Sequence, residues 1–354
     1  MVISLILLFF TCLSLSFFEE RFKERDKVIM YILLGLAMIV IAGMREVGST
    51  PDSDAYEAMY YAKDGDITIL LTEPSFSLIV SFLQTFSFGI NGLFFAYAIL
   101  SIPIHLSAFW RISRIPLLTL TIYISYYYMM HEMVQIRCGV ASGLFLWAIY
   151  FYTENKKFLT LLFILLGIFF HYSAAAGLVI FFFNNKLPRW QKMILYSIVP
   201  VGIVVYFTHF DISTLIPDEW GGLKLMKYRT MREKGIDDEL AGWKFEMNLL
   251  IWMNIVLYYC SIYYHDYLVK HFKYTTIAIK LQAVGFCFLF FVNGLSQVVG
   301  NRMNDYFSIA SILLWTASYY AFYPQILSKV ISSLISTFRF VTSMIAYALA
   351  LLFM

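Results

Sequence analysis

The stretch VIMYILLGLAMIVIAG (Val28–Gly43), followed at once by MREVGSTPDSDAY (Met44–Tyr56), decides the fold class. The first run carries no charge and approaches the length of a membrane-crossing helix, which needs about 20 residues for a hydrocarbon core of about 30 Å. The second run is polar and charged. The pattern predicts a chain that crosses a membrane and emerges into a polar loop.

Composition extends this prediction to the whole chain. The protein has 354 residues, of which 60% are hydrophobic, 19% aromatic and only 14% charged. Soluble domains carry about 25% charged residues, so a soluble fold is excluded. The apolar runs are continuous, which excludes the alternating strands of a barrel. We predict an all-α, polytopic integral membrane protein. The net charge of +3 is spread over many loops and indicates no nucleic-acid partner.

Apolar runs bounded by charges predict about twelve transmembrane helices in a single transmembrane domain, residues 1–354. The runs are Val2–Phe18, Val28–Gly43, Gly92–Phe109, Leu117–Met130, Gly139–Tyr152, Phe158–Phe170, Tyr172–Phe183, Trp190–Thr208, Phe245–Tyr264, Thr275–Val292, Asp305–Phe322 and Phe340–Met354. Phe76–Phe88 is long enough only for a re-entrant or half helix. Pro324–Thr337 alternates serine with isoleucine and leucine, which predicts an interfacial helix.

Short loops rich in Lys and Arg set the orientation, because such loops stay in the cytoplasm. The basic connections are Glu19–Lys27, Arg111–Arg114, Asn155–Lys157, Asn184–Lys192 and His265–Lys273. This orientation leaves the remaining polar segments outside. They are an outer motif loop (44–73), His131–Arg137, His171, a long outer loop (209–243) and Asn293–Arg302.

The outer motif loop contains helix-start chemistry. Thr50 is a capping hydroxyl, Pro51 suits a first helical position, and Asp52 and Asp54 suit a first turn. This predicts a short helix running to about Lys63. The two acids either cap that helix or act in catalysis, and both roles are compatible.

Arg45, Arg137, Arg302 and His171 all fall on the outer side. An arginine near a helix end commonly snorkels to headgroups, whereas a histidine at membrane depth is a functional candidate. Guanidinium groups bind phosphate oxygens in bidentate fashion, so several around one pocket suit a pyrophosphate. A nearby aspartate could take a proton from an attacking hydroxyl. No spacing indicates a metal site, a P-loop or a dinucleotide fingerprint, so we expect no metal and no cofactor.

The order of these motifs carries a family resemblance. Arg45 is followed by Val47-Gly48 and Asp52-x-x-x-Tyr56, then by Ile136-Arg137 opening a span, His171-Tyr172-Ser173 after the next span, and Arg302…Tyr306 late in the chain. In this the chain resembles the EpsG family of bacterial membrane proteins, grouped with Wzy-type polysaccharide polymerases. Extra residues after Gly48 leave either Asp52 or Asp54 as the family acid.

The resemblance implies a GT-C-like, metal-independent and inverting glycosyltransferase of the bacterial plasma (inner) membrane, with its active site facing the periplasm or exterior. It would transfer a growing glycan from a polyprenyl-pyrophosphate carrier to another lipid-linked repeat unit. The implied partners are this donor and acceptor, membrane lipid, a chain-length regulator and a flippase. The expected roles are pyrophosphate binding by Arg45, Arg137 and Arg302, catalysis by Asp52 or Asp54 with His171, and substrate contacts from Tyr56, Gln135, Tyr306 and Arg229.

Three other functions fit the same features. A glycan ligase would use the same pyrophosphate site with a different acceptor. A multi-span acyltransferase would favour a catalytic histidine on the opposite face. A lipid-linked oligosaccharide flippase or transporter would line a path through the membrane with cations, and would more often show repeated halves, of which this sequence has none.

Overall fold

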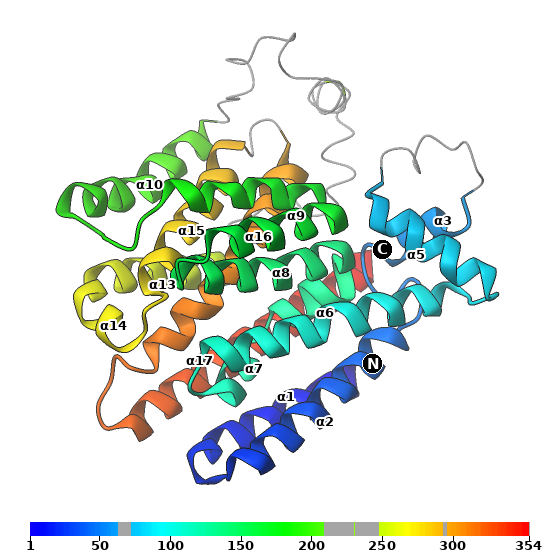
Figure 1. The fold of residues 1–354 in the computed structure, drawn as a ribbon, viewed down its shortest axis with the longest axis horizontal. Coiled ribbons are helices and arrows are strands. Elements are labelled where there is room, and N and C mark those ends of the chain that lie inside the picture. Colours follow the sequence, from blue (N-terminus) through cyan, green and yellow to red (C-terminus); the bar gives the residue numbers. More distant parts are fainter. Residues whose placement is uncertain (63–71, 209–229, 231–247, 293–295, 354) are drawn as a thin grey trace. The chain divides into compact units, whose positions relative to one another are not determined.

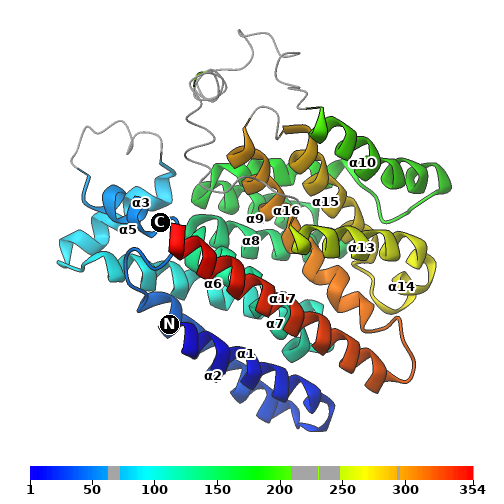
Figure 2. The same cartoon turned by 180° about the vertical axis from the view of Figure 1, so that it is seen from behind.

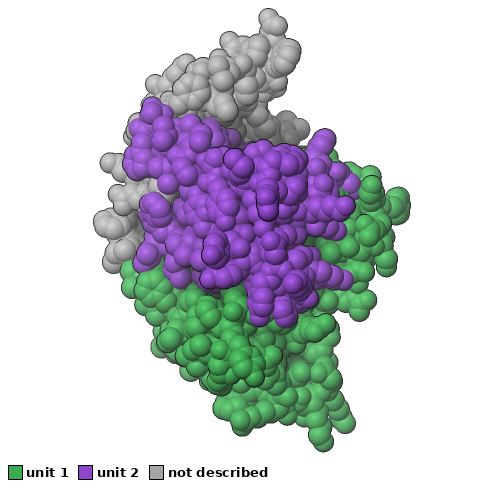
Figure 3. Space-filling model, turned by 90° about the vertical axis from the view of Figure 1, so that its left-hand side faces the viewer, with its two compact units in different colours: residues 1–179, 318–354 green, residues 180–317 purple. Residues whose placement is uncertain are grey.

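The computed structural model describes residues 1–62, 72–208, 230, 248–292 and 296–353, and these residues form helices and turns without a strand (Figure 1). The chain divides into two compact units (Figure 3). Unit 1 comprises residues 1–179 and 318–354, and unit 2 comprises residues 180–317. The single transmembrane domain stays a prediction.

Among the described residues, six helices are long and apolar enough to cross a membrane. They are α2 (Glu24–Gly43), α6 (Ile90–Ile112), α8 (Ile136–Thr153), α10 (Arg189–Phe207), α15 (Thr275–Cys287) continued by the π-helical η5 (Phe288–Val292), and α17 (Gln325–Phe353). Shorter apolar helices are α1 (Val2–Phe17), α9 (Lys157–Phe170), η3 (Tyr172–Phe182) and α13 (Leu249–Tyr263). This agrees with the predicted all-α membrane protein, while the number twelve and the GT-C-like fold stay predictions.

The core of unit 1 is built on α8, which packs against α6 and α9, while α6 packs on α2 (Figures 1 and 2). Gly139 and Gly143 on α8 form a G-x-x-x-G pair, which lets helices approach closely. A Cβ at Gly143 would lie 3.0 Å from the His105 ring of α6, and one at Gly139 would lie 2.4 Å from the backbone oxygen of His131. The two glycines therefore permit the close packing that brings polar side chains together inside this unit.

The run predicted to span from Leu117 to Met130 is not one helix. α7 covers only Pro116–Ile124, and a π-helix follows at Met129–Val134. The buried Glu19 carboxylate accepts the backbone N–H groups of Leu117 (2.9 Å) and Leu118 (3.1 Å), where an anion stabilises a helix start. π-Helical turns are rare in proteins, and those that occur are often found at functional sites. This one leads directly to Gln135 and the start of α8.

The motif loop also differs from its prediction. The short helix α3 covers Ser53–Tyr60 with Asp52 at its N-cap, so Pro51 precedes the helix, and Tyr61 ends it before Lys63. The Ser53 hydroxyl donates to the Thr50 carbonyl (2.6 Å) and accepts from the Gly48 N–H (2.9 Å). This local bonding, with Gly48 at a φ of +78° that favours glycine, moves the helix start beyond the expected position.

α5 (Pro74–Thr85) has the twelve residues expected of a half helix. The predicted interfacial helix Pro324–Thr337 and the predicted span Phe340–Met354 are, in contrast, one continuous helix, α17. Ser328, Ser332 and Ser336 are buried and recur every four residues, so they lie on one packed face of that helix. These serines interrupt the apolar sequence pattern, but the helix continues through them.

Unit 2 contains α10, α13, α14 (His265–His271), α15, η5 and α16 (Gln297–Ser318), and α10 packs against α15 and η5. The Lys280 ammonium of α15 donates to the backbone oxygens of Asn184 and Lys186, both at 2.8 Å, and to the Asn184 side chain at 3.0 Å. All three of its donors are used within the unit. Apart from Thr230, the predicted long outer loop (209–243) lies outside the described residues.

Candidate functional site

Glu73, the residue before α5, collects the polar contacts at one end of unit 1. It is only 4% exposed. Its Oε1 accepts from Nδ1 of His171 at 2.7 Å and from the backbone N–H of Tyr172 at 3.3 Å. Its Oε2 pairs with Nη1 of Arg137. One carboxylate thus joins residues from the starts of α5 and α8 and from the end of α9.

Arg137 lies in the first turn of α8 and is held among aromatic rings. Its guanidinium carbon lies 5.6 Å from the centroid of the Tyr56 ring and 5.5 Å from that of Phe76. Cation–π contacts of this kind stabilise a guanidinium that is partly removed from water. Its Nε is buried and has no hydrogen-bond partner in the described part of the chain. Arg137 therefore faces its helical neighbours and retains an unused donor.

His171 ends α9 in an extended conformation. Its backbone N–H donates to the Gly167 carbonyl at 2.8 Å, and its carbonyl accepts from the Ala174 N–H at 3.0 Å. Both backbone groups are thus fixed at the junction with η3. The side chain is 17% exposed, so part of it remains accessible.

The charges around Glu73 keep it ionised. Burial raises the pKa of this carboxyl, but the hydrogen bond from His171 and the electrostatic attraction of Arg137 and His171 outweigh it, bringing the pKa to about 2. The carboxylate is therefore negative at neutral pH. An anionic ligand approaching Arg137 competes with this built-in negative group.

Two other predicted residues lie near this cluster. Tyr56 is buried on α3 against Arg137. Gln135 joins the π-helix to α8, and its backbone N–H donates to Met130 at 2.8 Å. The two candidate acids are less buried than Tyr56. Asp54 is exposed and makes no ion pair or hydrogen bond to any described side chain. Asp52 is half-buried at the N-cap of α3.

Arg45 belongs to a second, deeper group. It is 2% exposed, its Nη1 donates to the carbonyls of Ala42 (2.8 Å) and Glu132 (3.1 Å), and its guanidinium lies 3.7 Å from the Phe94 ring centroid. Its Nε and Nη2 are buried without a partner among the described residues. The structure records no contact between Arg45 and Arg137.

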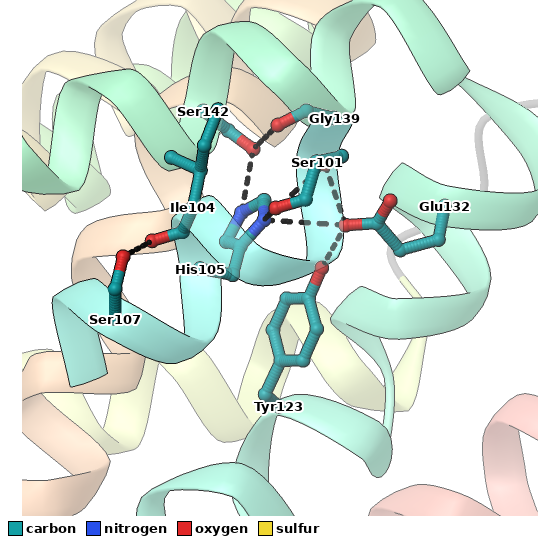
Figure 4. Close-up of polar contacts among 8 residues, drawn as sticks. All are labelled: Ser101, Ile104, His105, Ser107, Tyr123, Glu132, Gly139 and Ser142. Atoms are coloured by element: carbon teal, nitrogen blue, oxygen red, sulfur yellow. Dashed lines mark hydrogen bonds and ion pairs between the residues drawn. The ribbon is translucent and has the colours of Figure 1, made fainter. Parts of the chain in front are cut away.

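Glu132, whose backbone carbonyl accepts from Arg45, anchors a polar network through its carboxylate (Figure 4). Its Oε1 accepts from the hydroxyls of Ser101 (2.8 Å) and Tyr123, and lies 3.2 Å from Nδ1 of His105. The other nitrogen of His105 lies 3.2 Å from the Ser142 hydroxyl. One carboxylate thereby connects α6, α7, the π-helix and α8.

The remaining predicted residues are in unit 2 or undescribed. Arg302 is exposed on α16, and Tyr306 is fully buried on the same helix. Arg229 lies outside the described residues. No group of three or more His, Cys, Asp or Glu side chains in the described ranges could hold a metal ion.

Sequence reasoning missed Glu73 and Glu132. Glu73 stands directly before a proline that opens an apolar helix, and Glu132 follows His131 inside a largely apolar stretch. An acid at membrane depth is a functional candidate by default, and this signal applied to Glu132. The partnership of Glu73 with His171 joins residues 98 positions apart and has no local signal.

The comparisons with known proteins give one result. The profile of the EpsG family matches residues 28–354. No curated protein and no solved structure matches the chain. The match covers the motif loop, the Glu73 cluster, all of unit 2 and unit 1 from residue 28 onward, far more than half of the sequence. The chain therefore belongs to the EpsG family.

Proposed function

We propose that this protein polymerises polyprenyl-pyrophosphate-linked oligosaccharide repeat units at the outer leaflet of a bacterial plasma membrane. Membership of the EpsG family points to polysaccharide biosynthesis in general. The proposal adds the reaction, an inverting and metal-independent glycosyl transfer from one lipid-linked chain to another. The lipid-linked donor and acceptor are its substrates, and a flippase and a chain-length regulator are its expected partners.

The observation that carries the proposal is the pairing of Arg137 and His171 on the single carboxylate of Glu73. Two cationic or donor groups converge on one anionic oxygen pair, at the helix ends that the positive-inside pattern assigns to the exterior. This is the arrangement that a phosphate group requires, because its oxygens accept several short hydrogen bonds at once.

The chemistry follows from the leaving group. The bond between the anomeric carbon and the pyrophosphate oxygen breaks, and negative charge grows on the pyrophosphate. A guanidinium in a water-poor site stabilises this charge more strongly than it would in water. We assign this role to Arg137 first, because its Nε is an unused donor. Arg45 and Arg302 remain proposed companions.

The acceptor contacts are proposed on the same grounds. Tyr56 covers one side of the Arg137 guanidinium, and aromatic faces of this kind pack against sugar rings. Gln135 adds an amide close to the start of α8. Tyr306 and Arg229 are proposed as substrate contacts from their place in the sequence alone, and Asp52 and Asp54 as the alternative acids.

The test uses purified protein in lipid vesicles with a polyprenyl-pyrophosphate-linked repeat unit as the only substrate. Polymerisation yields a ladder of lengthened lipid-linked glycans on a gel. A single addition to a different acceptor indicates a ligase, and movement of the lipid across the bilayer without lengthening indicates a flippase. Either of these two results contradicts the proposal.

A further inference from the structure

We propose that His171 is the general base of this reaction, acting through Nε2, and that Glu73 is the positioning residue that holds it. The inference rests on the proposed glycosyl transfer and assigns a role to Glu73. It starts from the shared contact, in which Nδ1 of His171 lies 2.7 Å from Oε1 of Glu73.

The contact sets the proton positions on the ring. An ionised carboxylate only accepts hydrogen bonds, so Nδ1 of His171 must carry the proton. A neutral imidazole then has its lone pair on Nε2. No described residue bonds to Nε2, and the side chain is part-exposed. The ring is therefore oriented at one nitrogen and open at the other.

Glu73 also fixes the backbone around the ring. The same Oε1 that accepts from Nδ1 accepts the backbone N–H of Tyr172, at 3.3 Å. The His171 N–H donates to the Gly167 carbonyl, so the backbone is hydrogen-bonded at His171 and at the residue after it. This two-point attachment limits rotation of the imidazole, and a base held in one orientation is more effective than a free one.

The proposed step balances as follows. Nε2 of His171 takes the proton of an acceptor sugar hydroxyl while that oxygen forms a bond to the donor's anomeric carbon. The bond from that carbon to the pyrophosphate oxygen breaks, and the electron pair leaves with the lipid pyrophosphate. Glu73 stays ionised and stabilises the imidazolium, in the way that a buried carboxylate supports histidine in hydrolytic triads. Arg137 receives the departing charge.

Glu73 itself is poorly suited to be the base. Held by Arg137 and His171, it has a pKa of about 2 and takes up almost no proton at neutral pH. Asp54 is exposed and has no ion pair or hydrogen bond with a described side chain, so it has no group to orient it. Histidine has the ordinary pKa closest to neutral pH, where a base is most effective.

The experiment measures kcat and KM for the donor in wild type and Glu73→Gln, with Glu46→Gln as the matched control, since Glu46 is exposed in the same motif loop. The glutamine amide can donate to Nδ1 and favour the wrong tautomer. We expect kcat to fall about 100-fold or more. KM for the donor should stay the same or decrease, because Arg137 loses its competing anion. The control should match wild type.

The pH profile separates chemistry from structure. The charged group in contact with His171 is Glu73, from the start of α5. Arg137 of α8 shares that carboxylate, and Tyr56 of α3 and Tyr97 of α6 interact with Arg137. A base must be unprotonated, so the wild-type rate should fall on the acid side. In Glu73→Gln the rate should stay low across the whole pH range, because the tautomer with its lone pair on Nε2 is no longer favoured. Glu73→Asp should keep the wild-type limb.

Two further results decide the matter. In His171→Gly, added imidazole should restore part of the rate, which a purely structural ring would not allow. If Glu73→Gln does not fold, Glu73→Asp and the imidazole rescue carry the test. If the wild type forms a ladder and folded Glu73→Gln has the same kcat as wild type, the inference is wrong, while the proposed polymerisation is still supported. No ladder from wild type overturns the proposed function and the inference together.

Discussion

Unit 1 contains two glutamate–histidine pairs that differ in what surrounds them. In the outer pair, Glu73 and His171 lie 2.7 Å apart, and the second nitrogen of His171 is open. In the inner pair, Glu132 and His105 lie 3.2 Å apart, both side chains are at most 1% exposed, and Ser142 occupies the second histidine nitrogen. The same two side chains therefore build an accessible site in one place and a closed network in the other.

The difference separates catalysis from architecture. A histidine whose two nitrogens are both satisfied inside a packed core has no site left for a substrate, and its loss exposes other groups without partners. A histidine satisfied on one side only can transfer a proton. Each of the following predictions tests one side of this distinction.

The largest expected effect is on stability, from Glu132→Ala. This change leaves His105, Ser101 and Tyr123 without their shared acceptor inside the bundle. Leaving a buried hydrogen-bonding group without its partner costs about 1–3 kcal/mol per group. The unfolding temperature in detergent should fall sharply, while the rate per folded molecule stays within a few-fold of wild type. A Glu132→Gln protein of normal stability with 100-fold slower polymerisation would place this network in the chemistry instead.

Arg137→Ala should produce the largest loss of activity. Removing one donor to a developing oxyanion costs about 10²–10³-fold in kcat, or roughly 3–4 kcal/mol. The measurement is the initial rate of ladder formation by protein of normal monodispersity. Arg114→Ala is the control, because Arg114 is also an arginine beside a helix but is exposed. Equal rates in both variants would remove Arg137 from the site.

Acid should remove a stabilising contribution of the outer pair. The folded pKa of Glu73 is about 2, below the value of about 4.3 for an unfolded glutamate. The ionised form is thus favoured by folding, which contributes on the order of 3 kcal/mol above about pH 5. This contribution is lost as pH falls from about 4.3 towards 2.

Thermal unfolding of wild type and Glu73→Gln, compared from pH 7 down to pH 3, measures this change. The gap in unfolding temperature should narrow on acidification. If the difference in unfolding temperature between the two proteins stays constant over this range, the neighbours of Glu73 do not lower its pKa in the folded protein.

The smallest expected effects are those of Asp52→Asn and Asp54→Asn. Asp52 stands at the N-cap of α3 without a side-chain capping hydrogen bond, asparagine suits that position about as well as aspartate, and Asp54 is exposed. Each change should alter stability by no more than about 0.5 kcal/mol and activity by a few-fold. A 100-fold loss in either variant would return the base to the motif loop and reduce Glu73 to a structural role.

How far the sequence predicts this site depends on where the signal lies. Arg137 and His171 were found because each is a charged or polar side chain beside a long apolar run. Glu73 was not found, because its contacts with Arg137 and His171 form only when α5, α8 and α9 pack together. A contact across 98 residues leaves no spacing to detect.

The same distinction between local signals and packing applies to the prediction of the fold. Long apolar runs predicted α2, α6, α8 and α10 well, since helix length and hydropathy are local properties. The serine-rich face of α17 was misjudged because buried serines look like a polar interruption in one dimension. The π-helix before α8 was missed because it depends on packing against α6 rather than on composition.

α5 has a consequence for how a ligand enters. Of its twelve residues only Ser75, Phe76 and Leu83 are buried, whereas most of α8 is enclosed. Segments with few buried side chains open locally at a lower free energy than the helices of a core. Glu73, which neutralises Arg137, is carried at the end of such a segment. Whenever α5 loosens, the guanidinium stays behind on a rigid helix with its charge uncovered, and an incoming anion meets it first.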